Sequence, residues 1–170
     1  NPSQSFALNC TSIYQYMDHF IPNRYILISS VDVYEEKSDL AFNSEETLIN
    51  YSRLCTYGFH KYIAEQIVSQ TYENHLILRP SNIIGTGMKK GPFFDLINTR
   101  GFYINPFSRI DFIDADYIAD FIYAYISSCD MKIVNLCSSE SVTLVDLAQS
   151  LDISYSRKYG KISLTAIAQL

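Results

Sequence analysis

Three short apolar runs recur along the chain, and longer stretches with helical periodicity separate them. The runs are Tyr25–Ser29, Leu76–Leu78, which Arg79 ends, and Lys132–Leu136. Each run is rich in Ile, Leu or Val and lacks the alternation of a half-exposed strand. That pattern is typical of strands in a parallel sheet that helices cover on both faces. The sequence therefore predicts three buried β-strands.

The helical patterns lie at about residues 5–20, 51–72, 116–127 and beyond Ser141. The first stops before Ile21-Pro22-Asn23, a helix-breaking segment. The last begins with Thr143 as the expected N-cap and has Asp146 three residues later, an arrangement that resembles a capping box. Because strands and helices alternate without a repeat or a linker, we expect one α/β domain over residues 1–170 with a parallel sheet.

The first apolar run is suited to a central strand. Three parallel strands make a thin sheet, and Tyr25–Ser29 at its edge would be open to aggregation. We therefore expect this run in the centre, with further strands or another chain on its open side.

The helical pattern at 51–72 carries both an apolar stripe and candidate chemistry. Phe59, Ile63 and Ile67 fall four residues apart, so they predict its buried face. Tyr57 and Lys61 lie on an adjoining stripe, one turn apart and therefore close in space. His60 points away from that pair and is expected on the surface.

Composition limits the class of protein. Of the 170 residues, 48% are hydrophobic and 18% are charged, which favours a globular chain. The net charge of −5 argues against a general nucleic-acid binder, because phosphate binding needs clustered Lys and Arg. No apolar run approaches the roughly 20 residues of a membrane span, and no signal peptide opens the chain. We therefore expect a cytoplasmic protein without membrane or nucleic-acid partners.

The cysteines are scattered, with no Cys-x-x-Cys pair and no neighbouring histidines: Cys10, Cys55, Cys129 and Cys137. Reduced thiols are the expectation, although spacing alone also allows disulfides. A metal site is not expected, because the ligand spacing that metals require is missing.

Ser30, Tyr57 and Lys61 form the candidate catalytic set. Ser30 ends the first strand, and functional groups of open α/β sheets gather at the carboxyl ends of strands. A phenol with a pKa of about 10 is a poor base at neutral pH, and a Lys ammonium one turn away is expected to lower that pKa. The Ser30 hydroxyl would orient a substrate oxygen. By spacing alone, Tyr57 and Lys61 also fit a solvated pair on a helix surface.

Five ordered blocks carry a resemblance to one family. They are Tyr25-Ile-Leu-Ile-Ser-Ser-Val-Asp-Val-Tyr34, Tyr57-Gly-Phe-His-Lys61, Leu78-Arg-Pro-Ser-Asn-Ile-Ile-Gly85, Asp111-Phe-Ile-Asp-Ala-Asp116 and Asn135-Leu-Cys-Ser-Ser-Glu-Ser-Val142. The chain resembles the second half of an extended short-chain dehydrogenase/reductase, in the NAD-dependent epimerase/dehydratase group that acts on nucleotide sugars. The resemblance implies the later half of a Rossmann-type doubly wound parallel sheet with small substrate-binding elements.

The resemblance also implies roles for single residues. Tyr57 matches the catalytic acid/base, Lys61 its pKa partner and a ribose ligand, and Ser30 the catalytic hydroxyl. Besides Tyr57 and Lys61, the cofactor side comprises Asn9, Ser29, Pro80 and Ser81, and the substrate side comprises Asp32, Asn82 and Arg109. NAD or NADP as cofactor, a nucleotide sugar as substrate and a homodimer through the helices at 5–20 and 51–72 follow from the same resemblance.

Departures from the family pattern narrow the expected reaction. Ile110 stands where the family usually has an Arg that grips the diphosphate. Arg109 is one position earlier and would face the other side of a strand. Val31 and Asp32 replace the Asp-Glu pair of the 4,6-dehydratases, so an epimerase or a reductase is favoured over a dehydratase.

The glycine-rich dinucleotide fingerprint of the family is not in this sequence, nor is the acidic residue that reads the ribose. Gly85-Thr86-Gly87 does not supply the fingerprint, because Lys90 stands at the position of its next glycine, and we expect a tight turn there. The leading hypothesis is an NAD(P)-dependent epimerase or reductase. The rival is an inactive, truncated family member that serves as an interaction module.

Overall fold

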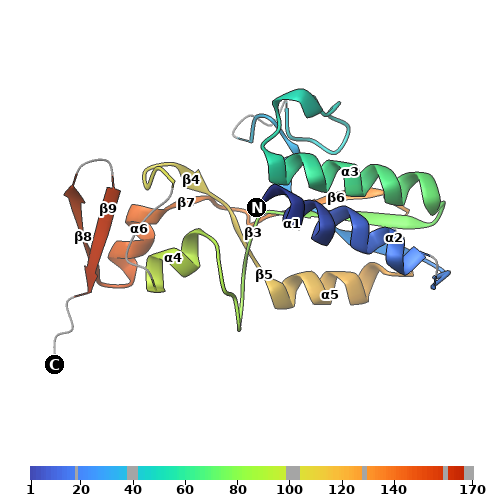
Figure 1. Cartoon of the computed structure of the whole chain (residues 1–170). Helices are drawn as coiled ribbons and strands as arrows, with labels where there is room; N and C mark the ends of the chain where they lie inside the picture. Colours follow the sequence, from blue (N-terminus) through green and yellow to red (C-terminus); the bar gives the residue numbers. More distant parts are fainter. Residues whose placement is uncertain (18, 38–41, 99–103, 128–129, 159–160, 167–170) are drawn as a thin grey trace. The chain divides into compact units, whose positions relative to one another are not determined.

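The structure is a computed structural model that describes residues 1–17, 19–37, 42–98, 104–127, 130–158 and 161–166, with backbone only from residue 154 onward. The chain forms two compact units (Figure 1). Unit 1 comprises Asn1–Ser81 and Ile122–Leu136, and unit 2 comprises Asn82–Phe121 and Cys137–Leu170. Each unit contains a buried hydrophobic cluster of its own. The expectation of a single domain stays a prediction.

Unit 1 is built on the three-stranded parallel sheet that the apolar runs predict. Its strands are β1 (Tyr25–Ile28), β2 (His75–Pro80) and β6 (Ile133–Leu136), in the order β1-β2-β6. Every residue of β2 is buried, because this strand pairs on both sides and needs apolar side chains on both faces. Among the described strands β1 pairs with β2 alone and forms one edge of this sheet, so its central position, which requires further strands or another chain on the open side, stays a prediction.

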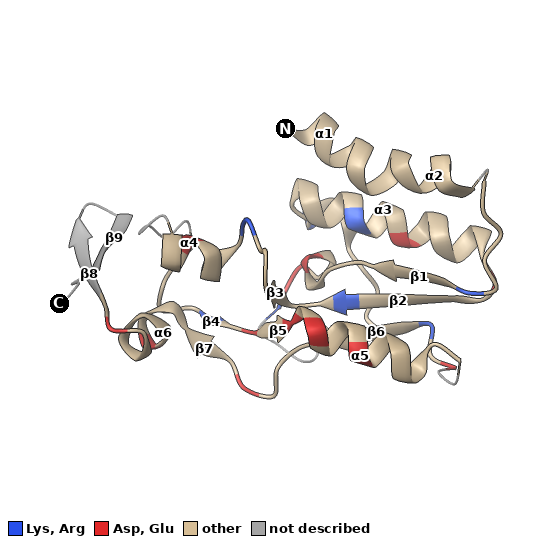
Figure 2. Ribbon diagram, turned by 90° about the horizontal axis from the view of Figure 1, so that it is seen from below, with Lys and Arg blue, Asp and Glu red and all other residues tan. Residues whose placement is uncertain are grey.

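The helical segments of unit 1 cover the sheet. The pattern at 5–20 forms α1 (Pro2–Phe6), the π-helical turn η1 (Ala7–Thr11) and α2 (Ser12–Met17). The pattern at 51–72 divides into the 3-10 turn η3 (Tyr51–Arg53) and the helix α3 (Thr56–Thr71). A further 3-10 turn, η2 (Val31–Val33), follows β1. α1, α2 and α3 lie side by side on the same face of the sheet (Figures 1 and 2).

The buried face of α3 differs from the predicted stripe. The buried residues of this helix are Gly58, His60, Ala64, Glu65 and Val68. Phe59 of the predicted stripe is exposed, and Ile63 and Ile67 are half-buried. The stripe is displaced because α3 packs against two partners at once, the sheet and the N-terminal helical segments.

Unit 2 consists of short elements. β3 (Asn82–Ile84) pairs in parallel with β5 (Phe112–Asp114), β4 (Arg109–Ile110) pairs antiparallel with β7 (Val142–Thr143), and β8 (Ile153–Lys158) pairs antiparallel with β9 (Lys161–Ala166). Its helices are α4 (Pro92–Asn98), α5 (Ala115–Tyr125), whose last turn belongs to unit 1, and α6 (Leu144–Ser150). The buried cluster consists of Leu96, Ile110, Leu144 and Ala148.

Two local predictions in unit 2 are confirmed. Thr143 caps α6: its Oγ1 accepts a hydrogen bond from Asp146 N at 3.0 Å and donates to Asp146 Oδ2 at 2.7 Å. The aspartate thus binds the capping hydroxyl, whereas the glutamate of a capping box reaches the backbone N–H of the N-cap residue. The segment Gly85-Thr86-Gly87 is a turn, with Met88 N donating to Gly85 O at 3.3 Å and a φ of 81° at Gly87.

Cys10 and Cys55 carry free thiols, Cys137 is exposed, and Cys129 lies outside the described residues. Within the described ranges, no group of His, Cys, Asp and Glu side chains is arranged to hold a metal ion. None of the described helices combines the length and hydrophobicity needed to cross a bilayer.

Candidate active site

The carboxyl end of β1 leads directly into η2 and places Ser30 at its N-cap. Ser30 has an extended backbone, with φ −163° and ψ 151°, and its Oγ accepts a hydrogen bond from Asp32 N at 3.1 Å. Serine is favoured at such a position because its short side chain satisfies an N–H at a helix start. The same hydroxyl hydrogen-bonds with the side chain of Tyr57. One serine therefore stabilises the local turn and contacts the first turn of α3.

Tyr57 and Lys61 lie one turn apart on α3, as their spacing predicts. Lys61 Nζ is 5.9 Å from the centroid of the Tyr57 ring. The ammonium also donates a hydrogen bond to the carbonyl oxygen of Ile28 at 2.9 Å, which holds it at the end of β1. The structure thus brings the three residues of the candidate catalytic set together within unit 1.

The pKa of Tyr57 is raised above its ordinary value, contrary to the expectation that Lys61 lowers it. Burial of the phenol is the main cause, and the charge of Asp32 adds to it. The hydrogen bond with Ser30 opposes both effects, because it stabilises the phenolate. The nearby Lys61 ammonium does not reverse this shift, and the phenol is protonated at neutral pH.

Gly58 permits a close approach between α3 and the turn that follows β1. A Cβ built on this glycine would lie 2.0 Å from the carbonyl oxygen of Asp32, well inside van der Waals contact. Glycine is otherwise unfavourable in a helix, so the close approach is a physical reason for its presence. The side chain of Asp32 forms an ion pair with Lys37. Gly58 therefore sets how near the first turn of α3, with Tyr57, comes to the end of β1.

Ser81 lies on the expected cofactor side and has a side-chain hydroxyl that is available for a further hydrogen bond. It follows Pro80 at the carboxyl end of β2, and its backbone N donates to Leu136 O at 2.8 Å. Its Oγ is buried and has no hydrogen-bond partner within the described part of the chain. Because a buried hydroxyl without a partner costs free energy, this position fits a ligand that hydrogen-bonds with it.

Asn9 and Ser29 are engaged inside unit 1. Asn9 lies in the π-helical turn, and its Nδ2 donates to Ser5 O at 2.8 Å. Such turns interrupt helices frequently at functional sites. Ser29 is buried, and its hydroxyl donates to Glu65 Oε1 at 2.5 Å. The Ser29 side chain is therefore used within the protein, which argues against the expected contact with a cofactor.

Asn82 and Arg109, assigned to the substrate by the resemblance, belong to unit 2, whereas the catalytic set belongs to unit 1. Asn82 Nδ2 donates to Asp111 O at 3.1 Å. Arg109 is exposed and its guanidinium donates to Ser141 O at 2.5 Å, whereas Ile110 is buried. The prediction that Arg109 and Ile110 face opposite sides of a strand is confirmed, so Arg109 does not replace a side chain at position 110.

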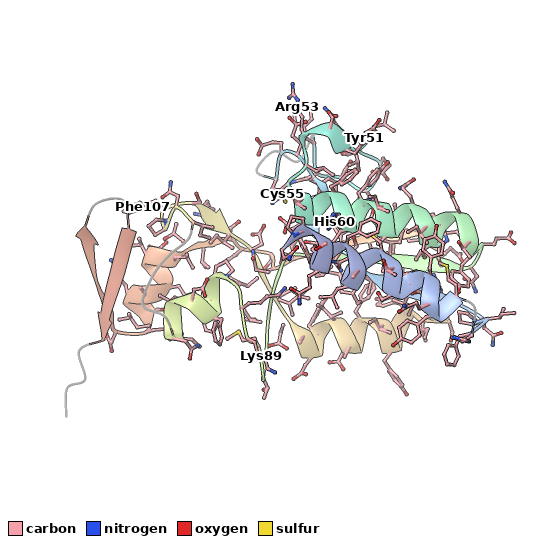
Figure 3. The ribbon with its side chains drawn as sticks, in the orientation of Figure 1. Tyr51, Arg53, Cys55, His60, Lys89 and Phe107 are labelled. Atoms are coloured by element: carbon pink, nitrogen blue, oxygen red, sulfur yellow. The ribbon has the colours of Figure 1, made fainter. Side chains whose placement is uncertain are left out.

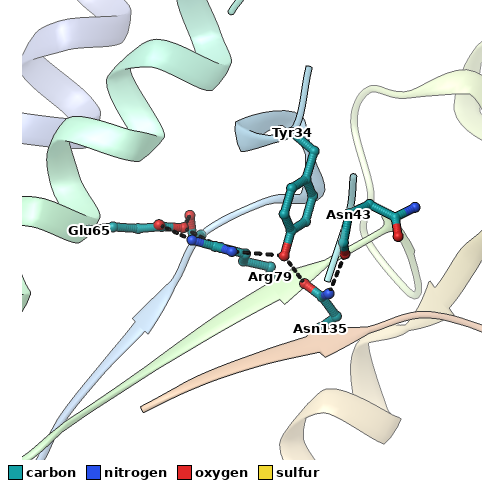
Figure 4. Close-up of polar contacts among 6 residues, drawn as sticks. Tyr34, Asn43, Glu65, Arg79 and Asn135 are labelled. Carbon is teal, nitrogen blue, oxygen red and sulfur yellow. Dashed lines mark hydrogen bonds and ion pairs between the residues drawn. The ribbon is translucent and has the colours of Figure 1, made fainter. Parts of the chain in front are cut away.

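A buried polar network beside the catalytic set was not predicted from the sequence (Figure 4). Glu65 of α3 and Arg79 of β2 form an ion pair, with Arg79 Nε 3.0 Å from Glu65 Oε1 and Nη2 2.7 Å from Oε2. Arg79 Nη1 donates to Tyr34 Oη at 2.7 Å, and Tyr34 Oη donates to Asn135 Oδ1 at 2.9 Å. The sequence carried one indication of this network: Arg79 ends an apolar run, and a buried charge requires an oppositely charged or hydrogen-bonding partner.

His60 is buried, so the prediction of a surface position is wrong. It is 7% exposed and lies between α1 and α3 (Figure 3). Its Nδ1 is 2.9 Å from Ser5 Oγ, and its ring contacts Phe6 edge-on, with 5.4 Å between ring centroids. The N-terminal helix covers α3 at His60, a contact that periodicity within α3 does not reveal.

The parallel sheet with its helices, and a Ser-Tyr-Lys set at the end of β1, define a Rossmann-like α/β protein. Residues 8–137 match the model of the NAD dependent epimerase/dehydratase family. The chain belongs to this family. None of the curated proteins matches the chain.

Solved structures share the fold at low sequence identity. The UDP-glucuronic acid 4-epimerase of Bacillus cereus, a mutant in complex with UDP-4-deoxy-4-fluoro-glucuronic acid and NAD, is 20% identical with a TM-score of 0.70 over 85% of this chain and 50% of that one. RMD from Pseudomonas aeruginosa, complexed with NADPH, is 20% identical with a TM-score of 0.69 over 89% and 59%. TunA, an NAD-dependent NDP-hexosamine 5,6-dehydratase, is 18% identical with a TM-score of 0.63 over 76% and 46%. The chain therefore spans about half the length of these proteins.

Proposed function

We propose that this chain supplies the catalytic side of an NAD- or NADP-dependent epimerase or reductase that acts on a nucleotide sugar or a similar hydroxyl or ketone substrate. The proposal rests on the convergence of Ser30, Tyr57 and Lys61 at the end of β1 in a member of this family. The complexes of the similar structures with NAD, NADPH and a UDP sugar support the choice of cofactor and substrate class.

Residues of unit 1 fit the nicotinamide side of such a cofactor. The buried Ser81 hydroxyl offers a hydrogen bond, Pro80 an apolar surface, and the Lys61 ammonium a donor for a ribose hydroxyl. NAD or NADP, when bound, supplies the acceptor or donor of the hydride at the carbon that bears the reacting oxygen. A glycine-rich dinucleotide-binding turn is not part of this sequence. The residues of unit 1 therefore account only for the nicotinamide side of the cofactor.

Tyr57 moves the proton. Its raised pKa keeps the phenol protonated at neutral pH, which is the form that donates a proton to a carbonyl oxygen during reduction. In the opposite direction the phenolate accepts the proton of a substrate hydroxyl, with the Lys61 ammonium as the nearby positive charge. Ser30, already hydrogen-bonded to Tyr57, orients the same substrate oxygen. One O–H bond forms as the other breaks, so the proton passes between Tyr57 and the substrate.

Tyr57→Phe tests this function in the full-length protein. Removing the phenol hydroxyl removes the proton donor, so kcat should fall by at least about 100-fold. Tyr62→Phe, on the same helix with its ring stacked on Tyr51, is the matched control and should retain activity. Turnover of UDP-hexoses and UDP-hexuronates is followed by the absorbance of the reduced nicotinamide and by product analysis. Wild-type turnover by Tyr57→Phe would refute the proposal.

We also infer a homodimer through the N-terminal helical segments and α3. Leu8 and Tyr14 are exposed on the first of these, and Phe59 is exposed on α3. An interface between two copies of this face would remove those apolar side chains from water. Sedimentation equilibrium should give twice the monomer mass, and a monomer at micromolar concentration would contradict the inference.

An interaction module without catalytic activity is the second candidate function. Ile110 favours it, because this residue is buried in the cluster of unit 2 where the family usually has an Arg for the substrate diphosphate. Titration of the full-length protein with NADH separates the two functions. Enhanced nicotinamide fluorescence on binding would exclude the module, whereas a folded protein that binds no cofactor would support it. The cytoplasmic location stays a prediction for both.

A further inference from the structure

Residues 28–30, at the end of β1, are each bound by a different residue of α3. Lys61 donates to the carbonyl of the first, Glu65 accepts from the hydroxyl of the second, and Tyr57 hydrogen-bonds with the hydroxyl of the third. The three residues of α3 are spaced by four and therefore form one stripe on the helix. Tyr57 and Lys61 have roles in the proposed chemistry, and Glu65 has none so far.

The buried carboxylate of Glu65 accepts hydrogen bonds from Ser29 and Arg79. Its side chain is 1% exposed, and that of Arg79 is 3% exposed. Oε1 accepts from Ser29 Oγ at 2.5 Å and from Arg79 Nε at 3.0 Å, and Oε2 accepts from Arg79 Nη2 at 2.7 Å. The remaining arm of the guanidinium donates to Tyr34 Oη. The carboxylate is therefore fixed on one side by the arginine (Figure 4). Its Oε1 is also the acceptor for the Ser29 hydroxyl.

Stability alone does not explain an ion pair at this position. Burial lowers the pKa of Arg79, but the hydrogen bond to Glu65 and the charge of Glu65 outweigh that effect and raise the pKa, so the guanidinium stays charged. Apolar side chains of similar volume commonly give a folded protein of equal or greater stability than a buried ion pair does. An apolar pair, however, offers no acceptor that could hold a serine hydroxyl in one direction.

We propose that Glu65 is a positioning residue: its carboxylate, oriented by Arg79, holds Ser29 and thereby keeps the adjoining Ser30 hydroxyl against Tyr57. The inference rests on the proposed function, because it concerns the geometry of the same proton transfer. Ser29 is held at its backbone as well, where its N donates to Leu78 O at 2.7 Å. Reacting groups need placement within about 0.5 Å. A hydroxyl on a loop that is not held by further hydrogen bonds does not achieve this precision.

The test uses the full-length protein and three variants. Ser29→Ala removes the hydroxyl that Glu65 holds and leaves the ion pair intact. Glu65→Leu combined with Arg79→Met replaces the buried pair by apolar side chains, which preserves folding better than either single change. Glu35→Gln combined with Arg53→Gln removes an exposed ion pair of the same unit and is the matched control.

The experiment measures the pKa of Tyr57 and the kinetic constants kcat and KM, together with the melting temperature. The pKa of Tyr57 comes from nuclear magnetic resonance of isotope-labelled tyrosine, with Tyr57→Phe identifying its signal. In Ser29→Ala and in the apolar pair this pKa should rise further, because the Ser30 hydrogen bond that lowers it is weakened. In both, kcat should fall about tenfold or more while KM stays within about twofold. The exposed-pair control should match the wild type in the Tyr57 pKa and in the kinetic constants.

A folded Ser29→Ala protein with unchanged Tyr57 pKa and unchanged kcat would overturn the positioning role, even if the apolar pair does not fold. A lower melting temperature with the same Tyr57 pKa would also overturn it, because it would show a purely structural ion pair. Failure of the proposed function is separate. Full turnover by Tyr57→Phe would refute that function, while the Tyr57 pKa of the Ser29→Ala protein would still report on positioning.

Discussion

Replacing Gly58 by alanine should destabilise the protein, although alanine is the better helix former. The new Cβ would lie 2.0 Å from Asp32 O and 2.9 Å from Asp32 C, where ordinary contact begins at 3.4 Å. The two segments would have to separate by about 1.4 Å at this point. The obstacle is backbone, so no side-chain rotation relieves it. Helix propensity favours alanine by up to about 1 kcal/mol, whereas overpacking costs about 1–3 kcal/mol, so the net change should be destabilising.

Urea unfolding of the wild type and of Gly58→Ala measures this change. Ser69→Ala is the matched control, because Ser69 is exposed on the same helix and alanine there meets no neighbouring backbone. The control should be neutral or slightly stabilising, within about 0.5 kcal/mol. Gly58→Ala should also weaken the hydrogen bond between Ser30 and Tyr57, since the first turn of α3 moves away from the end of β1. Equal or greater stability of Gly58→Ala would refute the steric reasoning.

Two further predictions concern pH and capping. The free energy of unfolding should fall as the pH rises above about 10, because burial raises the pKa values of Tyr25, Tyr34 and Tyr57. The folded chain then holds protons that the unfolded chain releases. Urea unfolding from about pH 8 to 11 checks this, Tyr25→Phe combined with Tyr34→Phe should reduce the fall, and a flat profile would contradict it. Thr143→Ala should cost about 1 kcal/mol, because it removes the cap of α6, while Thr143→Ser should retain most of it. Equal stability of the two Thr143 variants would argue against the cap.

Much of the fold and of the candidate site follows from local pattern. The three apolar runs become the three strands of unit 1, because a strand in a covered parallel sheet needs apolar residues on both faces. Tyr57 and Lys61 are neighbours because helix geometry places residues four apart on one side. Ser30 is expected near them because functional groups of open α/β sheets gather at the carboxyl ends of strands, and Ser30 follows β1. The cap at Thr143 depends on three successive peptide units alone.

Other features depend on partners that are remote along the chain. His60 is buried by Ser5 and Phe6 of the N-terminal helix, and no periodicity within α3 indicates that contact. The raised pKa of Tyr57 results from burial and from the charge of Asp32, both of which require the folded turn after β1. A lysine one turn away was a sound reason to expect the opposite direction, but burial is the larger effect here.

The sequence by itself indicated the three strands of unit 1, the longer helices and the cap at Thr143, since each depends on spacing within one segment, and it supplied Ser30, Tyr57 and Lys61 as the candidate catalytic set. It did not indicate α4 or the short strands of unit 2. Only the tertiary structure decided that β1 lies at the edge of the described sheet, and that Glu65 pairs with Arg79 and holds Ser29. The physical reason is that a buried charge is stabilised by whichever partner the fold brings within hydrogen-bond distance. Glu65 binds one residue 36 positions before it and another 14 positions after it.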